Sequence, residues 1–441
     1  MSSPRRHYLL ATVFLATIVT AILGCRHDDN TDQFHALPHP APGNALGHTR
    51  YVVFLPRDKF QMELLPVILF LNGWGQNGND GLRQVSNNFG QDVWRRRNQL
   101  PFLAVCPQCS EDGYWNPGGP DTAAALQCLD NAIERFGGDP DRVYVTGTSS
   151  GGHGAMEFAS AYPDRFAGVF PVAAGPPGDP QVLAAARMPI WCIVNRKDAK
   201  HRVELMRKSR RRWLQAGLSP IVIEADRRSG NFHNAWDEAY GPTVAYSWLL
   251  QQRLSENKQQ ELFTLSESKE ILKSWDQRGS AAWTINKQGE LLGTTKKGRG
   301  MLVSPSVTGE TEWHLDVFLK GAQRLRLGLF AEEPRREITD IILELPEIGS
   351  GGIRGPDGRW LATLDPMGQQ ALDNGWNDIR ISRKDGRIQF RINGWPAGEF
   401  KDPTSGQSLR WALIASHREP TRVRFIRQRG GLFRPVEARK P

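Results

Sequence analysis

The feature that most constrains the fold is a strand, a sharp turn and a helix-like segment within residues 141–162. Residues 143–145 form a β-branched and aromatic run, which predicts a short buried strand. The turn reads Gly-x-Ser-x-Gly over residues 147–151. Glycines suit this turn because a Cβ would crowd the crossing of strand and helix. The context predicts that Ser149 stands in a strained turn with its hydroxyl exposed, as a nucleophile does, whereas the alternative is an ordinary Gly/Ser-rich turn.

Length and composition predict two globular domains. The chain has 441 residues, of which 39% are hydrophobic and 23% charged, so a large core is possible. The net charge of +9 comes from arginine clusters, including residues 95–97, 207–212 and 335–336. No nucleic-acid-binding motif accompanies these clusters. Solvated helix faces are therefore favoured over a surface for nucleic acid or an acidic polymer, and no nucleic-acid partner is expected.

The N-terminus has the features of an export signal. Arg5 and Arg6 precede an uncharged apolar run over residues 8–23, and a small residue follows. This order predicts a signal peptide. The run is near the lower length limit of a membrane helix, so an uncleaved anchor is the alternative.

The end of this run, Ile-Leu-Gly-Cys at residues 22–25, resembles the lipobox of bacterial lipoproteins. That resemblance implies a lipoprotein signal peptide over residues 1–25, with lipid attached to Cys25 and the membrane as a partner. Arg26 is not the aspartate associated with inner-membrane retention. The expected location is therefore the bacterial cell envelope, periplasm-facing or in the outer membrane. Residues 26–44 are polar and Pro-rich, which predicts a flexible tether.

Four cysteines remain: Cys106, Cys109, Cys128 and Cys192. Export permits disulfides. Two residues separate Cys106 from Cys109, a spacing found in redox and zinc pairs, but no second Cys/His pair stands at zinc spacing. A structural disulfide and free buried thiols both fit these residues, and the pairing stays open.

Residues 45–253 alternate apolar strands with helical stretches. The expected strands are residues 51–56, 66–71, 102–107, 143–145, 189–194 and 220–224. Asp121 and Thr122 are expected to cap a helix that ends at residues 137–138. This alternation predicts a parallel α/β sheet covered by helices on both faces. The strand at 66–71 runs into a glycine-rich loop at 72–78, whose backbone N–H groups can face an anion.

Two residues downstream complete a catalytic pattern. Asp198 follows the strand at 189–194, and His233 lies after the strand at 220–224. A serine hydroxyl is a poor nucleophile until an imidazole takes its proton, and a carboxylate must fix the tautomer of that imidazole. The order Ser149, Asp198, His233 fits this chemistry.

Each of these two positions has alternatives. Asp198 can instead be a surface turn residue, with Glu224 or Asp226 as the acid. His233 can be an ordinary loop histidine. His153 follows the nucleophile closely and is expected to pack within the helix.

Residues 45–253 resemble the α/β-hydrolase esterases grouped with polyhydroxybutyrate depolymerases and with feruloyl and acetyl-xylan esterases, also labelled prolyl-oligopeptidase-like. Four motifs carry the resemblance: residues 72–75 (Asn-Gly-Trp-Gly), residues 106–109 (Cys-Pro-Gln-Cys) leading to Trp115, residues 147–152 (Gly-Thr-Ser-Ser-Gly-Gly), and residues 233–237 (His-Asn-Ala-Trp-Asp) before Tyr240. The resemblance implies a catalytic triad of Ser149, Asp198 and His233. It also implies an oxyanion hole from the backbone N–H groups of Trp74 and Ser150.

This chain departs from the family pattern at two positions. The family usually has His-Gly where Asn72 and Gly73 stand, which changes the hydrogen bonding of the loop. It usually has Gly where Asn195 stands ahead of Asp198. Neither departure removes a member of the triad.

A second domain is expected after a polar linker at residues 254–274. From residue 275 short alternating strands with turn residues between them predict an antiparallel β-sandwich over residues 275–441. Residues 375–379, 393–395 and 423–425 resemble the concanavalin A-like jelly roll of laminin-G and 3-keto-disaccharide hydrolase-type domains.

No convincing carboxylate pair stands in the second domain, which favours a binding or docking module over an enzyme. Trp360, Trp376 and Trp395 are candidates to stack on sugar rings, with core packing as the alternative.

These features predict an exported, lipid-anchored serine esterase that needs no metal or cofactor. The resemblance implies carboxylic esters as substrates, on plant or microbial polysaccharide and of acetyl or feruloyl type. The alternatives are a serine peptidase of the prolyl-oligopeptidase type and a non-catalytic, carbohydrate-binding surface lipoprotein.

Overall fold

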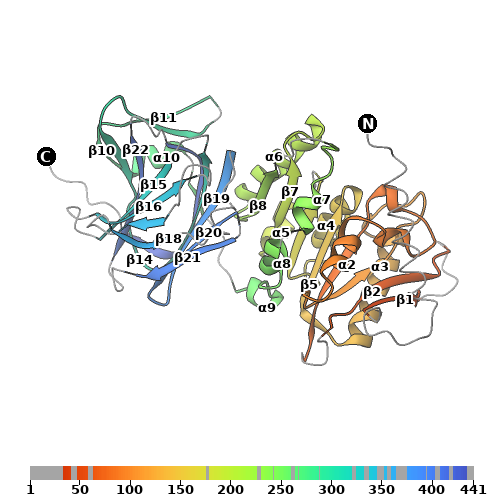
Figure 1. Cartoon of the computed structure of the whole chain (residues 1–441). Helices are drawn as coiled ribbons and strands as arrows, with labels where there is room; N and C mark the ends of the chain where they lie inside the picture. Colours follow the sequence, from red (N-terminus) through yellow and green to blue (C-terminus); the bar gives the residue numbers. More distant parts are fainter. Residues whose placement is uncertain are drawn as a thin grey trace. The chain divides into compact units, whose positions relative to one another are not determined.

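The structure of the chain is a computed structural model (Figure 1). It describes residues 33–40, 47–57, 63–174, 178–225, 230–241, 243–259, 264–266, 268–287, 289–319, 324–331, 337–344, 352–354, 359–363, 375–393, 395–402, 408–416 and 421–434. The predicted signal peptide and Cys25 lie outside these residues. Within them, no helix is long and apolar enough to cross a membrane. The chain divides into two compact units, residues 1–260 and residues 261–441.

The first unit is built on an eight-stranded sheet with the order β1-β2-β4-β3-β5-β6-β7-β8. Its strands are β1 (Phe34–Pro38), β2 (Arg50–Phe54), β3 (Leu65–Leu71), β4 (Leu103–Cys106), β5 (Gly138–Thr148), β6 (Gly168–Val172), β7 (Trp191–Asn195) and β8 (Ile221–Ala225). The pairings β1–β2 and β2–β4 are antiparallel, and the pairings from β4 to β8 are parallel. The predicted α/β sheet is therefore confirmed as parallel from β4 to β8. The sheet as a whole is mixed, because the predicted strand at residues 51–56 and β1 form an antiparallel edge.

Helices cover both faces of this sheet. They are α2 (Asn88–Arg96), α3 (Pro120–Phe136), α4 (Ser150–Ala161), α5 (Pro180–Ala185), α6 (Lys200–Gln215), α7 (Trp236–Tyr240) and α8 (Thr243–Leu249), with 3-10 turns η2 (Trp74–Gln76) and η3 (Arg83–Val85). Ile68 and Phe70 of β3 join one core cluster with side chains of α2, α7 and α8. Val67 and Leu69, which alternate with them, are equally buried, and α3 and α4 contact β3 and β5. Burial on both faces explains the continuous apolar run in this strand.

The start of α3 differs from the sequence prediction. Asp121 does not cap the helix, because Gly119 is the N-cap and Pro120 occupies the first turn, where its missing N–H costs nothing. Asp121 instead accepts hydrogen bonds from the backbone and hydroxyl of Ser110. The predicted end is confirmed, because Gly137 adopts the left-handed conformation of a C-cap (φ 71°).

The predicted flexible tether over residues 26–44 is wrong in the middle of that segment. Residues 34–38 form β1, which pairs antiparallel with β2 and extends the sheet. Phe34 and Leu37 are buried, and the ring of Phe34 packs 5.1 Å from the ring of Phe54. These apolar side chains stabilise the strand despite the polar composition around them.

The predicted linker over residues 254–274 is structured. It contains α9 (Leu254–Asn257), β9 (Thr264–Ser266) and α10 (Ser268–Ser274). Asn257 is 1% exposed and donates a hydrogen bond to the carbonyl of Ala167 (2.8 Å), while Ser255 donates from its backbone and hydroxyl to Asp141. The helix α9 thus belongs to the first unit, and β9 belongs to the second, because it pairs with β23 (Thr421–Arg434).

The second unit is an antiparallel sheet assembly. Besides β9 and β23 it contains β10 (Asp276–Gly279), β11 (Ala282–Ile285), β12 (Leu291–Thr294), β13 (Arg299–Val303), β14 (Ser306–Leu319), β15 (Arg324–Ala331), β16 (Glu337–Glu344), β17 (Gly352–Arg354), β18 (Trp360–Thr363), β19 (Gly375–Lys384), β20 (Arg387–Ile392), β21 (Trp395–Lys401) and β22 (Leu409–Ser416). The long strand β14 pairs antiparallel with β19 and β23. Strands β19 and β20 form a hairpin that turns at Asp385 and Gly386, which both have positive φ.

Alternate residues of β14 separate an apolar core from a charged cluster. Trp313, Leu315 and Val317 lie in the core. Asp316 lies opposite Asp378 of β19, and the sequence analysis missed this carboxylate pair.

The pair is held by arginine. Arg427 contacts Asp316 and Asp378 at 3.4 and 3.3 Å. Burial raises the pKa of Asp378, but Arg380, His314 and Arg427 outweigh it and lower that pKa to about 2. A carboxylate held ionised by arginines is no proton donor, so the cluster fits a buried ion-pair network. The structure describes the strands that carry Trp360, Trp376 and Trp395 but not these three side chains. Their stacking on sugar rings therefore stays a prediction.

Candidate active site

Ser149 occupies the sharp turn between β5 and α4. Its backbone has φ 55° and ψ −116°, a conformation that costs a non-glycine residue about 1–3 kcal/mol. The turn is fixed on both sides, because the Ser149 N–H donates to the carbonyl of Val172 (2.9 Å) and its carbonyl accepts from the N–H of His153 (3.1 Å). Strain maintained in this way is a feature of functional sites.

Two glycines make this turn possible. A Cβ on Gly151 would lie 2.0 Å from the carbonyl oxygen of Leu71, and a Cβ on Gly147 would lie 2.3 Å from the carbonyl oxygen of Gly151. Both obstacles are backbone atoms, so rotation of a side chain does not relieve them. The Gly-x-Ser-x-Gly pattern therefore reflects the crossing of β3, β5 and α4.

We expect Gly151→Ala to lower the free energy of unfolding by about 3 kcal/mol, the upper part of the usual range for an inserted methyl group, because backbone must move to admit it. Gly75→Ala is the matched control, since a Cβ there meets nothing within 4 Å. The control should change the free energy by less than about 1 kcal/mol. Chemical denaturation measures both, and equal midpoints for the two variants would contradict the packing argument.

The structure brings Ser149, His233 and Asp198 into one hydrogen-bonded chain. His233 Nε2 lies 2.9 Å from Ser149 Oγ, and His233 Nδ1 lies 2.8 Å from Asp198 Oδ2. Asp198 follows β7 in the turn before α6, and His233 lies between β8 and α7. The carboxylate is nearly buried (side chain 3% exposed), whereas the imidazole is partly open to solvent (23%). An imidazole in this position can take a proton from the serine while the carboxylate orients it.

The turn that carries Asp198 is shaped by Asn195, which stands where the resemblance leads one to expect a glycine. Asn195 is fully buried. Its side-chain oxygen accepts the N–H of Lys197 (2.9 Å), and its carbonyl accepts the N–H of Asp198 (3.0 Å). A glycine would supply only the second of these bonds.

Arg202, on the first turn of α6, contacts Asp198 and His233, and the sequence reasoning did not identify it. Asp198 Oδ1 accepts from Arg202 Nη1 (3.1 Å) and from the backbone N–H of Ala199 (2.6 Å). Arg202 Nη1 also lies 3.4 Å from His233 Nδ1. These donors fix the carboxylate whose other oxygen faces the imidazole. The sequence held one signal for this contact: the arginine stands four residues after the aspartate, a spacing at which side chains are neighbours on a helix.

The other candidates do not join this chain. Glu224 forms a two-point ion pair with Arg207 (3.0 and 2.6 Å). Asp226 lies outside the described residues. His153 sits on α4, where burial and then the charges of Arg202 and His233 lower its pKa, so it stays neutral near pH 7.

The loop after β3 lies directly against the serine. A Cβ on Gly73 would lie 3.6 Å from Ser149 Cβ and 3.0 Å from the carbonyl oxygen of Thr148. Trp74 begins η2 beside it, and Ser150 is the first residue of α4, so its N–H has no partner from its own helix. This places the two predicted oxyanion-hole residues on elements that adjoin Ser149.

Asn72 ties this loop to its surroundings. Its amide donates to the carbonyl of Gly73 (3.0 Å) and to the side chain of Asn77 (2.9 Å), while its side-chain oxygen accepts the N–H of Cys109 (3.0 Å). The indole of Trp115 donates to the Asn72 carbonyl (2.9 Å). Asparagine thus gives the loop both donors and an acceptor. Through Cys109 and Trp115 these bonds join the two predicted motifs at residues 72–75 and 106–115.

The four described cysteines are free and buried. Of the two alternatives, a structural disulfide and free buried thiols, the structure therefore shows free buried thiols. Burial raises the pKa of Cys106 and Cys109, the pair at redox spacing, well above the ordinary thiol value. Neither fits a reactive thiolate. Within the described residues no group of three or more His, Cys, Asp or Glu side chains can hold a metal ion.

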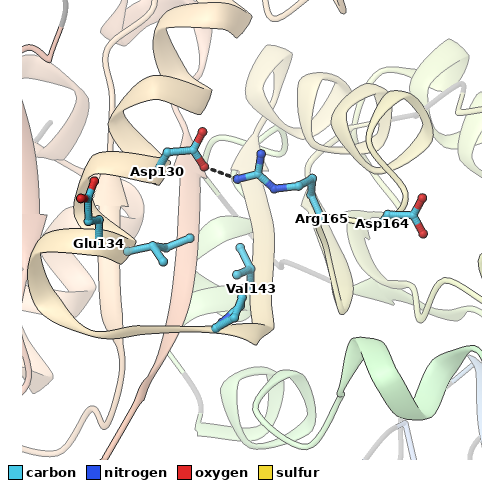
Figure 2. Close-up of a pocket in the computed structure, with 7 residues that line it drawn as sticks. Asp130, Glu134, Val143, Asp164 and Arg165 are labelled. Carbon is cyan, nitrogen blue, oxygen red and sulfur yellow. Dashed lines mark hydrogen bonds and ion pairs between the residues drawn. The ribbon is translucent and has the colours of Figure 1, made fainter.

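A separate surface pocket of about 290 Å³ lies between the C-terminal half of α3 and the first residues of β5 (Figure 2). Its lining residues are Asp130, Ile133, Glu134, Pro140, Val143, Asp164 and Arg165. Arg165 pairs with Asp130 across it. Val143 stands six residues before Ser149, roughly 20 Å along an extended strand. This pocket is therefore distinct from the serine site.

The strand order, the strained serine between strand and helix, and the hydrogen-bonded Ser149, His233 and Asp198 together resemble the arrangement of α/β-hydrolases. No protein-family profile matches the chain.

Two relatives align with part of the chain. Poly(3-hydroxyalkanoate) depolymerase C of Paucimonas lemoignei is 39% identical over 71 residues, which are 16% of this chain. Secreted lipase 5 of Gibberella zeae is 34% identical over 101 residues, which are 21% of this chain. The alignments span 17% and 19% of the relatives' own lengths. Among solved structures, a thermostable esterase is 24% identical with a TM-score of 0.45, covering 50% of this chain and 64% of its own.

Proposed function

We propose that the first unit is a serine hydrolase that cleaves carboxylic esters. The observation that carries this proposal is the hydrogen-bonded chain from Ser149 through His233 to Asp198 on a strained turn. An ester is favoured as the substrate because the aligned segments come from a lipase and a polyester depolymerase.

The proposed reaction has two steps. His233 Nε2 takes the proton of Ser149 as Oγ attacks the ester carbonyl carbon, and Asp198 holds the imidazole Nδ1–H. The tetrahedral intermediate collapses when its C–O bond to the leaving alkoxide breaks, and the His233 imidazolium protonates that oxygen so that the alcohol departs. Water, deprotonated by His233, then attacks the acyl-enzyme, and the acid leaves as Ser149 regains its proton. The N–H groups of Trp74 and Ser150 are proposed to stabilise the oxyanion in both steps.

The proposal is tested with a panel of p-nitrophenyl esters, acetylated xylan, feruloyl esters and peptide anilides. We expect hydrolysis of the esters, with acetyl or feruloyl groups on polysaccharide as the natural form. Cleavage of peptide anilides alone would favour the peptidase alternative. No turnover of any substrate would favour the non-catalytic binding protein.

We also propose that the protein is exported to the cell envelope and anchored through lipid on Cys25. The support is the basic segment, apolar run and Ile-Leu-Gly-Cys sequence at its N-terminus. Labelling with radioactive palmitate tests this, because wild type should carry label and Cys25→Ser should not. Label retained by Cys25→Ser would contradict the assignment.

For the second unit we propose a concanavalin A-like jelly roll that holds the enzyme on polysaccharide. A chain ending at residue 260, which keeps α9 and its contacts, should retain kcat on a soluble p-nitrophenyl ester. It should lose activity on insoluble acetylated xylan, because attachment raises the local substrate concentration only at a surface. The measured quantity is the ratio of polymer to soluble-ester activity. The same ratio in the full and truncated chains would contradict the proposed role.

A further inference from the structure

Arg202 on the first turn of α6 touches both the proposed acid and the proposed base. Its Nη1 donates to Asp198 Oδ1 (3.1 Å) and lies 3.4 Å from His233 Nδ1. The other oxygen of Asp198 lies 2.8 Å from the same Nδ1. A guanidinium, a carboxylate and an imidazole thus meet at one nitrogen of the proposed base.

The contact between Arg202 and His233 does not stabilise the tautomer that the proposed reaction needs. An ionised carboxylate only accepts hydrogen bonds, so Asp198 Oδ2 takes the Nδ1–H of His233. A guanidinium only donates, and a ring nitrogen that carries hydrogen offers it no lone pair. The bond to Asp198 therefore holds Arg202 against an imidazole with which it shares no proton.

The effect of this contact depends on the charge of the imidazole. Neutral His233 can take the serine proton and the imidazolium cannot, while the positive charge of Arg202 disfavours the imidazolium. Arg202 also pairs with the carboxylate that would stabilise this cation. Both effects favour the neutral imidazole, and water weakens both because the Arg202 side chain is 36% exposed.

Other described groups bear on His233 from the elements around it. They are Lys197 in the turn after β7, His153 on α4 and Asp237 on α7. Burial lowers the pKa of His153, and the charges of Arg202 and His233 lower it further, so it adds no charge near pH 7. The lysine and the aspartate contact residues next to His233 in the sequence, whereas Arg202 reaches Nδ1 itself.

We propose that Arg202 is a positioning residue that keeps His233 unprotonated at mildly acidic pH and so extends the activity of the site into that range. This inference rests on the proposed serine hydrolase function and concerns the response of that site to pH. Its support is geometric, because a nearly buried carboxylate fixes the guanidinium in contact with the imidazole. Orienting Asp198 alone needs only the bond to Oδ1.

The test measures kcat/KM on p-nitrophenyl acetate as a function of pH, because the acid limb of this profile reports the protonation of the base in the free enzyme. Arg202→Gln and Arg202→Met remove the charge, and Arg202→Lys keeps it. Arg207→Gln is the matched control, since it removes one positive charge from the same helix at a residue that pairs with Glu224. Thermal unfolding of each variant establishes that the fold is kept.

We expect the acid limb to move to higher pH by about 0.5 to 1 unit in Arg202→Gln and Arg202→Met, because the imidazolium then persists to higher pH. Arg202→Lys and Arg207→Gln should keep the acid limb of wild type. A merely structural role would lower kcat/KM by the same factor at every pH, and an unmoved limb of this kind would overturn the proposal. A shift in Arg202→Lys as large as that in Arg202→Gln would also overturn it, because the charge would not be the cause.

A direct titration separates this inference from the proposed function. Nuclear magnetic resonance of protein with isotope-labelled histidine follows the protonation of His233 without turnover, and His233→Gln identifies the signal. The midpoint should lie about 0.5 to 1 pH unit higher in Arg202→Gln than in wild type. This difference in a protein that hydrolyses no ester would support the inference and refute the proposed function. Equal midpoints in an active esterase would overturn the inference alone.

Discussion

Ser149→Ala is expected to abolish ester hydrolysis while leaving thermal unfolding close to that of wild type. The hydroxyl is the only serine atom that forms the bond to substrate in the proposed reaction, and alanine leaves no nucleophile for His233 to activate. The fold should persist because the turn is set by Gly147 and Gly151 and by backbone hydrogen bonds of residue 149. Activity on p-nitrophenyl acetate, measured with a circular dichroism melt, tests both expectations.

Ser160→Ala provides a control on the same helix. Its hydroxyl accepts a hydrogen bond from the N–H of Asp179 (2.9 Å), away from the triad. This variant should hydrolyse the ester at close to the wild-type rate. Full activity in Ser149→Ala would rule out the assignment of the nucleophile, whereas an unfolded Ser149→Ala would contradict the account of the turn.

Asp198→Asn is expected to lower kcat about 10⁴-fold with little change in structure. The asparagine amide would face His233 Nδ1, which favours the tautomer that cannot accept the serine proton. Arg202 Nη1 and the Ala199 N–H would still hold the side-chain oxygen. The measurement is kcat on a soluble ester, with Glu224→Gln as the control because Glu224 pairs with Arg207.

Measuring kcat on the same soluble ester also distinguishes Asp198 from Asp226, the other aspartate that the sequence offers as the acid of the triad. If Asp198→Asn retains wild-type kcat while Asp226→Asn is inactive, the acid has been misassigned. A loss of kcat in Glu224→Gln equal to that in Asp198→Asn would likewise contradict the assignment.

Local signals predicted the elements that carry the candidate site. The apolar runs at residues 66–71 and 143–145 predicted central strands because both faces of the sheet are buried, and β3 and β5 lie there. The glycine pattern around Ser149 predicted the turn because its packing constraint is local. Asp198 and His233 were predicted as partners because each follows a predicted strand and the order Ser149, Asp198, His233 fits nucleophile, acid and base.

Features that depend on distant contacts could not be predicted in this way. The strand β1 is short and lies in a polar segment, and its pairing with β2 decides its structure. Asn257 looks like a linker residue until its bond to Ala167 is seen. Asp316 and Asp378 lie far apart in the sequence, and only the register of β14 with β19 places them opposite each other.

The most direct test of the central claim is labelling with a fluorophosphonate, which forms a covalent bond to an activated serine. Intact wild-type protein should gain one label, and peptide mapping should place it on Ser149. Asp198→Asn should be labelled far more slowly, because the serine is activated through His233. Label on Ser149 at a rate that falls with Asp198→Asn is the predicted result. An unlabelled wild-type protein, or a label on another residue, would contradict the claim that Ser149 is the nucleophile of an esterase.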